Sequence, residues 1–546
     1  MNDVGFQPGP VTRPVGLETE FGVLRPGDAY ANPVVLSTRV VEAYSVGAGV
    51  PTARWDYEGE DPLADLRGGR LRRSAAHPSQ LTDDPARPAP SGDVPPAPWG
   101  SRARPSAAEA ALPRATTAVL VNGARFYVDH AHPEYSSPEV LTPRDALIWD
   151  RAGEVVARRA MTALDEGSVD APAQIVLYKN NVDGKGAAYG SHENYLVRRD
   201  VPFEALAEVL TPFLVTRPVL VGSGRVGIGQ RSERPGFQIS QRADYVESEI
   251  GLQTTFNRPI INTRDEPHAD NVRWRRLHVI NGDANRFDVP IYLKVATTDL
   301  LLWFLEQACT EGSGRFKEAL GRLKDLAIIG DPVEEHWALS HDPTLSHELR
   351  TQAGALTALA IQRAFLDVIS PAVTRVEDAQ AHRALALWRQ VLDALEQWRH
   401  DGSGPAAQMV EWVAKYELCE GLRRRSGTGW DDPRLAALDI QWADLRPGRS
   451  VVDKLDAAGR IHRLVTDAEI QNAVDTPPEG TRAAIRGTAI RRHRQVVGAS
   501  WTCLLLDVPG APALARLRLP DDVVVGSDET ATILEEIGRR ADPERH

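Results

Sequence analysis

Three side chains that could take part in chemistry alternate along one short segment: Arg125, Tyr127 and Asp129. The segment follows Asn122-Gly123, and an Asn-Gly pair between apolar and β-branched runs predicts the turn of a β-hairpin, because both residues tolerate a positive φ. Successive side chains of a strand project to opposite faces, so these three share one face. A carboxylate beside a cation and a phenol can act as a nucleophile or as a base.

More titratable groups follow the same strand at once, namely His130, His132 and Glu134. Phe126 and Val128 alternate with the polar residues and give the strand an apolar face that can pack on a core. The polar face therefore carries a crowded set of ionisable groups. Two interpretations are open at this point: a reactive site, or a polar hairpin tip with solvated charges.

Glu18 and Glu20 form a second acidic pair near the start of the chain. The segment from Val15 to Val23 is predicted to be a short strand that ends at Gly22, and alternation puts both glutamates on one face. Two carboxylates on one strand face repel each other unless a cation lies between them. The pair is therefore either exposed to solvent or part of a site for a divalent metal ion.

Arginine and histidine cluster in the middle of the chain, at Arg242, Arg264, His268, Arg276 and His278. Apolar, strand-like pieces flank each of them. Guanidinium and imidazole groups beside buried strands suit contacts with phosphate or with an oxyanion. Structural ion pairs with nearby Asp and Glu would give the same pattern.

Composition excludes some classes of function. The 546 residues are 25% charged and 42% hydrophobic, with a net charge of -12. Proteins that bind nucleic acid usually display a basic surface, so that role is not expected. The first ten residues do not have the pattern of a signal peptide, and the apolar run at Leu300 to Leu305 is too short to span a membrane. Three widely spaced cysteines suggest neither a zinc site nor disulfides, and we expect a cytoplasmic protein.

The length predicts one large domain and a smaller one. We expect a catalytic domain over residues 1–480 and a small C-terminal domain over 481–546, which contains a predicted strand from Trp501 to Val508. Nine prolines lie between Pro78 and Pro113. A mobile, proline-rich insert is therefore predicted at about 54–115, with Arg54 to Glu58 as a docking segment at its start.

These motifs together resemble the Pup ligase and deamidase family, within the carboxylate-amine ligase fold related to glutamine synthetase. The resemblance rests on Glu18-Thr-Glu20, the hairpin, S-H-E-N-Y at Ser191–Tyr195, I-N-T-R-D-E-P-H at Ile261–His268 and R-R-L-H at Arg275–His278. It implies an α+β fold in which a curved, mostly antiparallel β-sheet forms a cradle packed on helices. A small C-terminal α/β domain would close one edge.

Two enzymes share the family scaffold. A ligase attaches the small disordered protein tag Pup to lysines, whereas a hydrolase deamidates the C-terminal Gln of Pup and removes Pup from pupylated proteins. The segments Asp129–Tyr135 and Tyr178–Tyr195, and the insert that begins at Arg54, are similar to the hydrolase. The sequence from Glu18 to Phe21 has the form that is usual for the ligase, although the motif keeps both carboxylates in the two enzymes.

The resemblance also implies the cofactors, ATP and Mg²⁺, and the residues that hold them. Magnesium ligands are expected at Glu18, Tyr127 and Glu134, with Glu20 and His192 as further ligands. Contacts with ATP are expected at Arg125, Ser137 and Trp501. Contacts with phosphate or with the carboxylate of the tag are expected at Arg242, Arg264, Arg276 and His278.

Asp129 is the expected catalytic residue, because no Ser-His-Asp or Cys-His set is visible from the spacing. It could attack the γ-carbonyl of the last residue of the tag, or deprotonate a water molecule. The same-fold alternative is a ligase that phosphorylates the carboxylate of the tag and lets lysine attack. An inactive nucleotide-binding adaptor is a second alternative, but it would need a broken acidic set, and Glu18, Asp129 and Glu134 are all present.

Overall fold

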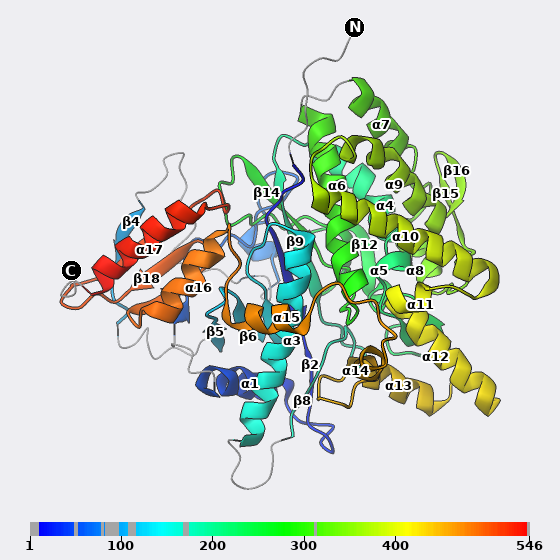
Figure 1. The fold of residues 1–546 in the computed structure, drawn as a ribbon, viewed down its shortest axis with the longest axis horizontal. Helices are drawn as coiled ribbons and strands as arrows, with labels where there is room; N and C mark the ends of the chain where they lie inside the picture. Colours follow the sequence, from blue (N-terminus) through cyan, green and yellow to red (C-terminus); the bar gives the residue numbers. More distant parts are fainter. Residues whose placement is uncertain are drawn as a thin grey trace.

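An eight-stranded sheet lies at the centre of the computed structural model, which describes residues 10–47, 53–77, 81, 98–106, 116–166, 174–310 and 314–542 (Figure 1). All neighbouring strands are antiparallel except β12 and β13, so the predicted antiparallel character is confirmed. The spatial order is β12 (Val246–Gly251), β13 (Arg258–Asn262), β14 (Trp274–Val279), β9 (Ser191–Arg198), β1 (Val15–Glu20), β7 (His132–Ser136), β6 (Arg125–Asp129) and β5 (Thr117–Val119).

The predicted hairpin is present as β5 and β6, which pair antiparallel. Its loop is longer than a two-residue turn: the Leu120 N–H donates to the Ala124 carbonyl and the Gly123 N–H to the Leu120 carbonyl. Gly123 has φ 83°. Asn122 instead uses its side chain, whose Nδ2 donates to the Ala473 carbonyl at 2.9 Å. The Asn-Gly pair therefore fixes the loop through the backbone conformation of Gly123 and the side-chain hydrogen bonds of Asn122.

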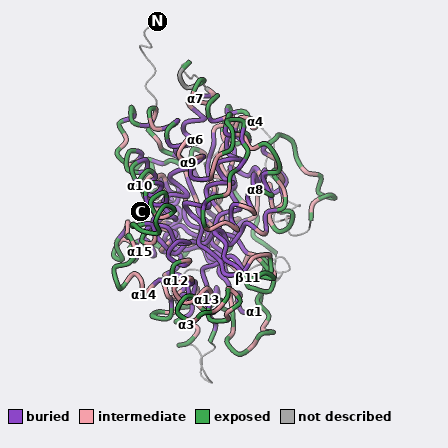
Figure 2. Tube along the Cα trace, turned by 90° about the vertical axis from the view of Figure 1, so that its right-hand side faces the viewer, coloured by how far each residue is buried: buried purple, intermediate pink, exposed green. Residues whose placement is uncertain are grey.

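Alternation along the strands works as predicted. Leu17 and Phe21 of the first strand segment and Phe126 of β6 are buried in the main hydrophobic core. They face helices α1 (Pro33–Gly47) and α3 (Pro143–Glu166), which pack against β1, β6 and β7. The purple, buried stretches run through the middle of the molecule in Figure 2. The opposite face of the sheet is left to the polar side chains.

Further helices extend the core beyond the sheet. On α10 (Ala379–Asp401), Leu385, Trp388, Leu392 and Leu395 recur every three or four residues, the period of a helix, and are all buried, while Trp398 at the same spacing is half-buried. The other helices of this body are α4 (Phe203–Thr216), α5 (Pro218–Val221), α6 (Asp288–Thr310), α7 (Gly314–Lys324), α8 (Pro332–Ser340), α9 (Ala358–Val373), α11 (Ala406–Met409), α12 (Glu411–Ser426), α13 (Pro433–Ala443), α14 (Val451–Ala457) and α15 (Asp467–Asp475). Among the described residues, none of the helices combines the length and the apolar character of a membrane span.

Three pairs of strands form small separate sheets at the edges of this body. They are β2 (Gly22–Leu24) with β8 (Val176–Tyr178), β10 (Arg225–Ile228) with β11 (Arg234–Gln238), and β15 (Glu348–Thr351) with β16 (Gly354–Thr357). The first pair continues β1 beyond Phe21, so it leads the chain away from the central sheet.

A second, five-stranded sheet contains the C-terminal strands and both ends of the insert. Its order is β3 (Arg54–Trp55), β17 (Val496–Ala499), β18 (Cys503–Leu506), β19 (Leu514–Arg518) and β4 (Trp99–Arg102). In Figure 1, the blue β4 lies beside the orange and red α16 (Arg482–Arg492), β18 and α17 (Ser527–Ala541). The insert is thus attached to the C-terminal sheet at both ends.

This second sheet has its own hydrophobic cluster, in which Trp55 packs with Ile485, Leu504 and Ile537. We keep the domain boundary at residue 480 as a proposal, with the addition that β3 and β4 pack with the C-terminal unit. Much of the segment from Ala76 to Leu112 lies outside the described residues. The predicted mobility of the insert therefore stays a prediction.

Helix α16 holds the second sheet against the first. Glu139, just after β7, accepts hydrogen bonds from Arg482 Nε at 2.8 Å and from the buried Arg486. Arg486 also donates to the Gly123 carbonyl at 2.8 Å. A Cβ on Gly487 would lie 2.5 Å from the Val121 carbonyl oxygen, so the helix meets the hairpin loop at backbone contact.

The close contact between Gly487 and the hairpin loop can be tested by mutation. Replacing Gly487 by Ala should lower the free energy of unfolding by about 1–3 kcal/mol, because the methyl group meets backbone atoms that cannot move aside. Gly321, in α7, is the matched control: a Cβ there meets nothing within 4 Å. Gly321→Ala should instead stabilise the protein by about 0.5–1 kcal/mol. Urea unfolding measures both, and equal effects would contradict the tight contact.

Candidate active site

The strand register brings the predicted acidic residues onto one face of the central sheet. Glu20 of β1 lies opposite Glu134 of β7, and Glu18 lies opposite His192 of β9. On the other side of β7, Tyr127 of β6 is the partner of Glu134. The two acidic motifs, more than a hundred residues apart in the sequence, therefore form one continuous polar surface.

Glu18 is the centre of the first cluster on this surface. His192 Nδ1 lies 3.1 Å and His278 Nε2 3.7 Å from Glu18 Oε2, and Asn194 Nδ2 donates to Oε1 at 3.0 Å. Burial by itself would raise the pKa of Glu18, but the two imidazoles hold it well below its usual range. One atom each from Glu18, His192 and His278 could bind the same metal ion.

His278 is the most deeply buried member of this cluster. Burial, and then the charge of Arg276, lower its pKa to about 3, so its imidazole is neutral at physiological pH. Neither ring nitrogen has a hydrogen-bond partner among the described residues. The neutral ring is therefore available to a ligand or to a metal ion.

The second cluster consists of Glu20, Asp129 and Glu134, whose oxygens lie within 4.8 Å of one another. The Tyr127 hydroxyl and Ser136 Oγ both donate to Glu134 Oε1, the latter at 3.0 Å. Burial, and then the nearby carboxylates, raise the pKa of Glu134 well above its usual range. A divalent cation held by these oxygens would relieve the repulsion.

Asp129 lies at the rim of the second cluster, at the end of β6, and its side chain is 33% exposed. Its Oδ2 is 2.8 Å from His130 Nδ1, and this hydrogen bond raises the pKa of His130. His132 of β7 lies opposite Asp129 in the strand register, and its Nδ1 is 3.4 Å from Glu20 Oε2. Asp129 thus combines access for a substrate with a position beside the acidic groups.

Arg125 is held between aromatic rings. Its guanidinium lies 3.7 Å from the ring centre of Tyr127 and 4.1 Å from that of Trp55. Its Nη2 also donates to the Tyr57 hydroxyl at 3.0 Å. The sequence predicts that the segment from Arg54 to Glu58 docks, but nothing in it indicates that Trp55 and Tyr57 reach Arg125.

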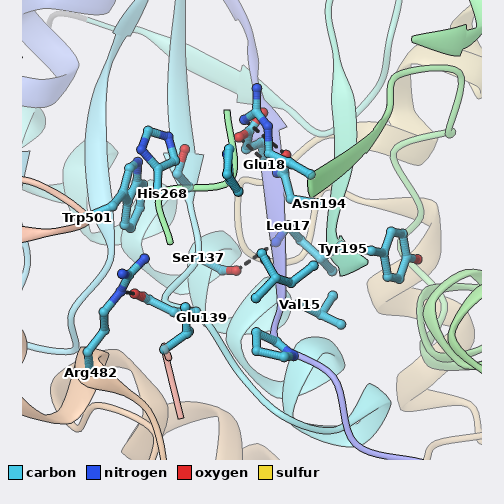
Figure 3. A pocket seen from close by; sticks show the side chains of 17 residues that line it. Val15, Leu17, Glu18, Ser137, Glu139, Asn194, Tyr195, His268, Arg482 and Trp501 are labelled. Atoms are coloured by element: carbon cyan, nitrogen blue, oxygen red, sulfur yellow. Dashed lines mark hydrogen bonds and ion pairs between the residues drawn. The ribbon is translucent and has the colours of Figure 1, made fainter. Parts of the chain in front are cut away.

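A pocket opens beside the first cluster (Figure 3). It is lined by three predicted site residues besides Glu18, namely Ser137, Arg276 and Trp501. Ser137 Oγ accepts a hydrogen bond from the Leu17 N–H at 2.9 Å, which fixes the end of β7 against β1. Arg482 and Glu139, which are not among the predicted site residues, also line this pocket, as does His268 of the arginine and histidine cluster noted in the sequence.

The remaining predicted arginines are divided between the two clusters. Arg276 donates to Asn194 Oδ1 at 3.3 Å and lies beside Arg264, which pairs with Glu266 at 3.3 Å. Arg242 lies near Glu20 of the second cluster. Its Nη1 and Nη2 donate to the backbone carbonyls of Tyr189 and Ile280. Burial, and then the charge of Arg258, lower the pKa of Arg242 to about 9.

The arginines therefore differ in their partners. The interpretation as a structural ion pair fits Arg264, whose carboxylate partner is two residues away. It does not fit Arg242, for which the described residues include no carboxylate within 4 Å.

Comparisons with known proteins place this arrangement in a family. Residues 13–505 match the Pup-ligase protein family. The chain belongs to this family. It is 44% identical over 511 residues to the Pup deamidase/depupylase of Mycobacterium tuberculosis (strain CDC 1551 / Oshkosh), and the match covers 92% of this chain and 93% of that protein.

Two solved structures are similar over most of the chain. The ligase PafA in its complex with Pup has a TM-score of 0.73 at 28% identity, covering 97% of this chain and 92% of that one. PafA in complex with ADP has a TM-score of 0.67 at 33% identity, covering 79% and 91%. The α+β fold predicted for this member of the Pup-ligase family is confirmed.

Replacing Glu134 by Gln should stabilise the metal-free protein at neutral pH. The pKa of Glu134 is higher in the folded than in the unfolded protein, where it is 4.5. Its contribution to the free energy of unfolding is therefore complete below pH 4.5 and is lost as the pH rises through the folded pKa. Gln keeps an acceptor for Tyr127 and Ser136 but carries no charge. The melting temperature in EDTA should rise, and its increase on adding Mg²⁺ should shrink.

The exposed Glu247, on edge strand β12, is the control for this substitution. Glu247→Gln should change neither melting temperature. A lower melting temperature of Glu134→Gln in EDTA would show that hydrogen bonds to the carboxylate outweigh the repulsion.

Proposed function

We propose that this chain is an ATP- and Mg²⁺-dependent amidohydrolase that deamidates the C-terminal Gln of Pup to Glu and cleaves the bond between Pup and the lysine of a pupylated protein. The observation that carries the proposal is the position of Asp129: an accessible carboxylate at the rim of an acidic cluster, on a sheet face that also borders a pocket. The 44% identity to a Pup deamidase/depupylase supports the same activity. The cytoplasmic location expected from the sequence is part of this proposal.

Mg²⁺ would be held by Glu18, Tyr127 and Glu134, with Glu20 and His192 as further ligands. Four of these five donors are oxygens, which magnesium prefers, and the nearby carboxylates raise the pKa of Glu134, a repulsion that a cation would relieve. Bound Mg²⁺ would supply positive charge for the nucleotide phosphates and for an oxygen that becomes negative in the reaction.

ATP would occupy the pocket of Figure 3, which Ser137 and Trp501 both line. Arg125 would reach the phosphates from β6, since the rings of Trp55 and Tyr127 fix its guanidinium beside the second cluster. The ADP complex of PafA, at 33% identity, supports a nucleotide site in this chain.

Arg242, Arg264, Arg276 and His278 would contact phosphate or the carboxylate of the tag. Arg276 and His278 each have a buried nitrogen without a partner among the described residues, which a ligand oxygen could satisfy. Among the described residues, the hydrogen bonds of the Arg242 guanidinium go to backbone carbonyls, so an anion could pair with its positive charge.

Asp129 would act on the side-chain amide of the last residue of Pup. In one route its carboxylate oxygen attacks the carbonyl carbon, the C–N bond breaks, and ammonia or the lysine amine leaves with a proton from solvent before water hydrolyses the resulting anhydride. In the other route Asp129 takes a proton from water, the water oxygen attacks the same carbon, and the C–N bond breaks as this proton passes to the leaving amine. In this second route His130, hydrogen-bonded to Asp129, is placed to exchange a proton with it.

The alternative function is a Pup-protein ligase, because the same scaffold occurs in PafA. That alternative has less support: the identity to the Pup--protein ligase of Nocardioides sp. is 38% over 72% of this chain, against 44% over 92% to the deamidase/depupylase. An inactive adaptor has no support from the site, since the residues of both acidic clusters are present and converge.

One experiment separates these functions. The purified chain is incubated with ATP, Mg²⁺ and Pup ending in Gln, and Pup is weighed by mass spectrometry. Deamidation replaces –NH₂ by –OH, so we expect the small mass gain of that exchange, together with release of Pup from a pupylated protein. Conjugation of a Glu-ended Pup to lysine without either hydrolysis would identify a ligase instead.

Asp129→Asn should abolish hydrolysis and leave nucleotide binding nearly intact. The substitution keeps the shape of the side chain and removes its negative charge and basicity, and groups of this kind contribute roughly two to four orders of magnitude in rate. Single-turnover deamidation and calorimetric ADP titration measure the two effects. A variant that keeps more than about a hundredth of the wild-type rate would exclude Asp129 as nucleophile or base.

A further inference from the structure

Arg482, at the start of α16, is the buried cation of the pocket that the proposed function leaves unused. Its side chain is 3% exposed. Its backbone N–H donates to the Val523 carbonyl at 3.0 Å, and its Nε donates to Glu139 Oε1 at 2.8 Å. The guanidinium is thus fixed in direction from both ends.

One nitrogen of this guanidinium is left over. Nη1 of Arg482 is buried and has no hydrogen-bond partner within the described part of the chain. Burial lowers the pKa of Arg482 in spite of the neighbouring Glu139. A buried donor without a partner costs free energy, which an acceptor on a ligand in the pocket would recover.

The surroundings indicate which part of a ligand lies here. Figure 3 shows Arg482 and Glu139 on the same side of the pocket as the flat rings of Trp501 and His268. Arg486 lies 4.9 Å from the ring centre of Trp501 and so supports the indole from outside the pocket lining.

The pocket has two chemically different ends. Figure 3 shows Arg482 and Trp501 apart from Glu18 and Asn194, and Val523, whose carbonyl accepts the Arg482 N–H, adds an apolar side chain beside Arg482. Glu18 and Asn194 give the other end its polar character. An aromatic plane, apolar walls and a single fixed donor suit a heteroaromatic base, whereas phosphates suit the polar end beside the expected metal site.

We propose that Arg482 recognises the base of the bound nucleotide, by donating a hydrogen bond from Nη1 to a ring nitrogen while the base lies against Trp501. Glu139 is the positioning residue, because it holds the guanidinium through Nε. The inference rests on the proposed function in one respect, namely that this pocket takes a nucleotide. It adds a base contact that comes from the C-terminal unit.

The test compares a ligand that has a base with one that lacks it. ADP and inorganic pyrophosphate are titrated, with Mg²⁺, into the full chain and into Arg482→Gln. We expect the variant to bind ADP roughly tenfold more weakly or worse, and to bind pyrophosphate as the wild type does. Arg491→Gln, an exposed position on the same helix, should change neither affinity.

A second variant controls for the possibility that Arg482→Gln does not fold. Arg482→Lys keeps a positive charge toward Glu139 but loses the planar fork, so it should fold and still bind ADP more weakly than the wild type. Unchanged ADP affinity in both variants, or equal weakening of ADP and pyrophosphate, would overturn the base contact while leaving the nucleotide pocket in place. A wild-type protein that binds no ADP would overturn the proposed function as well.

Discussion

Backbone hydrogen bonds between β1 and its neighbours β7 and β9 hold together side chains that repel one another. Glu20 faces Glu134 across one pair of strands, and Glu18 lies on the same surface. The repulsion is tolerated because the other face of the same strands is locked into the core by residues such as Leu17 and Phe126. A slip of one residue would send carboxylates into that core, so the hydrophobic pattern keeps the acidic cluster assembled.

This arrangement has a consequence for binding. The acidic groups need no rearrangement to meet a cation, because the sheet has already placed them within 4.8 Å of one another. Positive charge at this cluster would relieve the repulsion that raises the pKa of Glu134. Asp129 stays at the rim, where a substrate can reach it, and is the member of the cluster with the most exposed side chain.

The pocket beside the cluster depends on a second long-range interaction, the pairing of Glu139 with Arg482 and Arg486. It joins the central sheet to the C-terminal unit, and Trp501 is brought to the pocket with that unit. The start of the insert joins the same unit through β3, so Trp55 reaches Arg125 from the other side. Three distant parts of the chain thereby surround one site.

Much of this could be predicted because the signals are local. The alternation of β1 and β6, the hairpin around Gly123 and the core face of α10 each depend on residues a few positions apart. The strands β3 and β4 could not be predicted in the same way. They contain two and four residues, and such short segments show no periodicity; their partners lie hundreds of positions away.

The sequence by itself determined which side chains share a strand face, and its motifs indicated the family and the acidic residues. Only the tertiary structure decided which strands are neighbours, and so which carboxylates meet. It also brought Arg482 to a pocket formed with Glu139, a partner 343 positions away. The physical reason is that a strand or a helix is encoded within one segment, whereas the pairing of segments depends on burial and register across the whole chain.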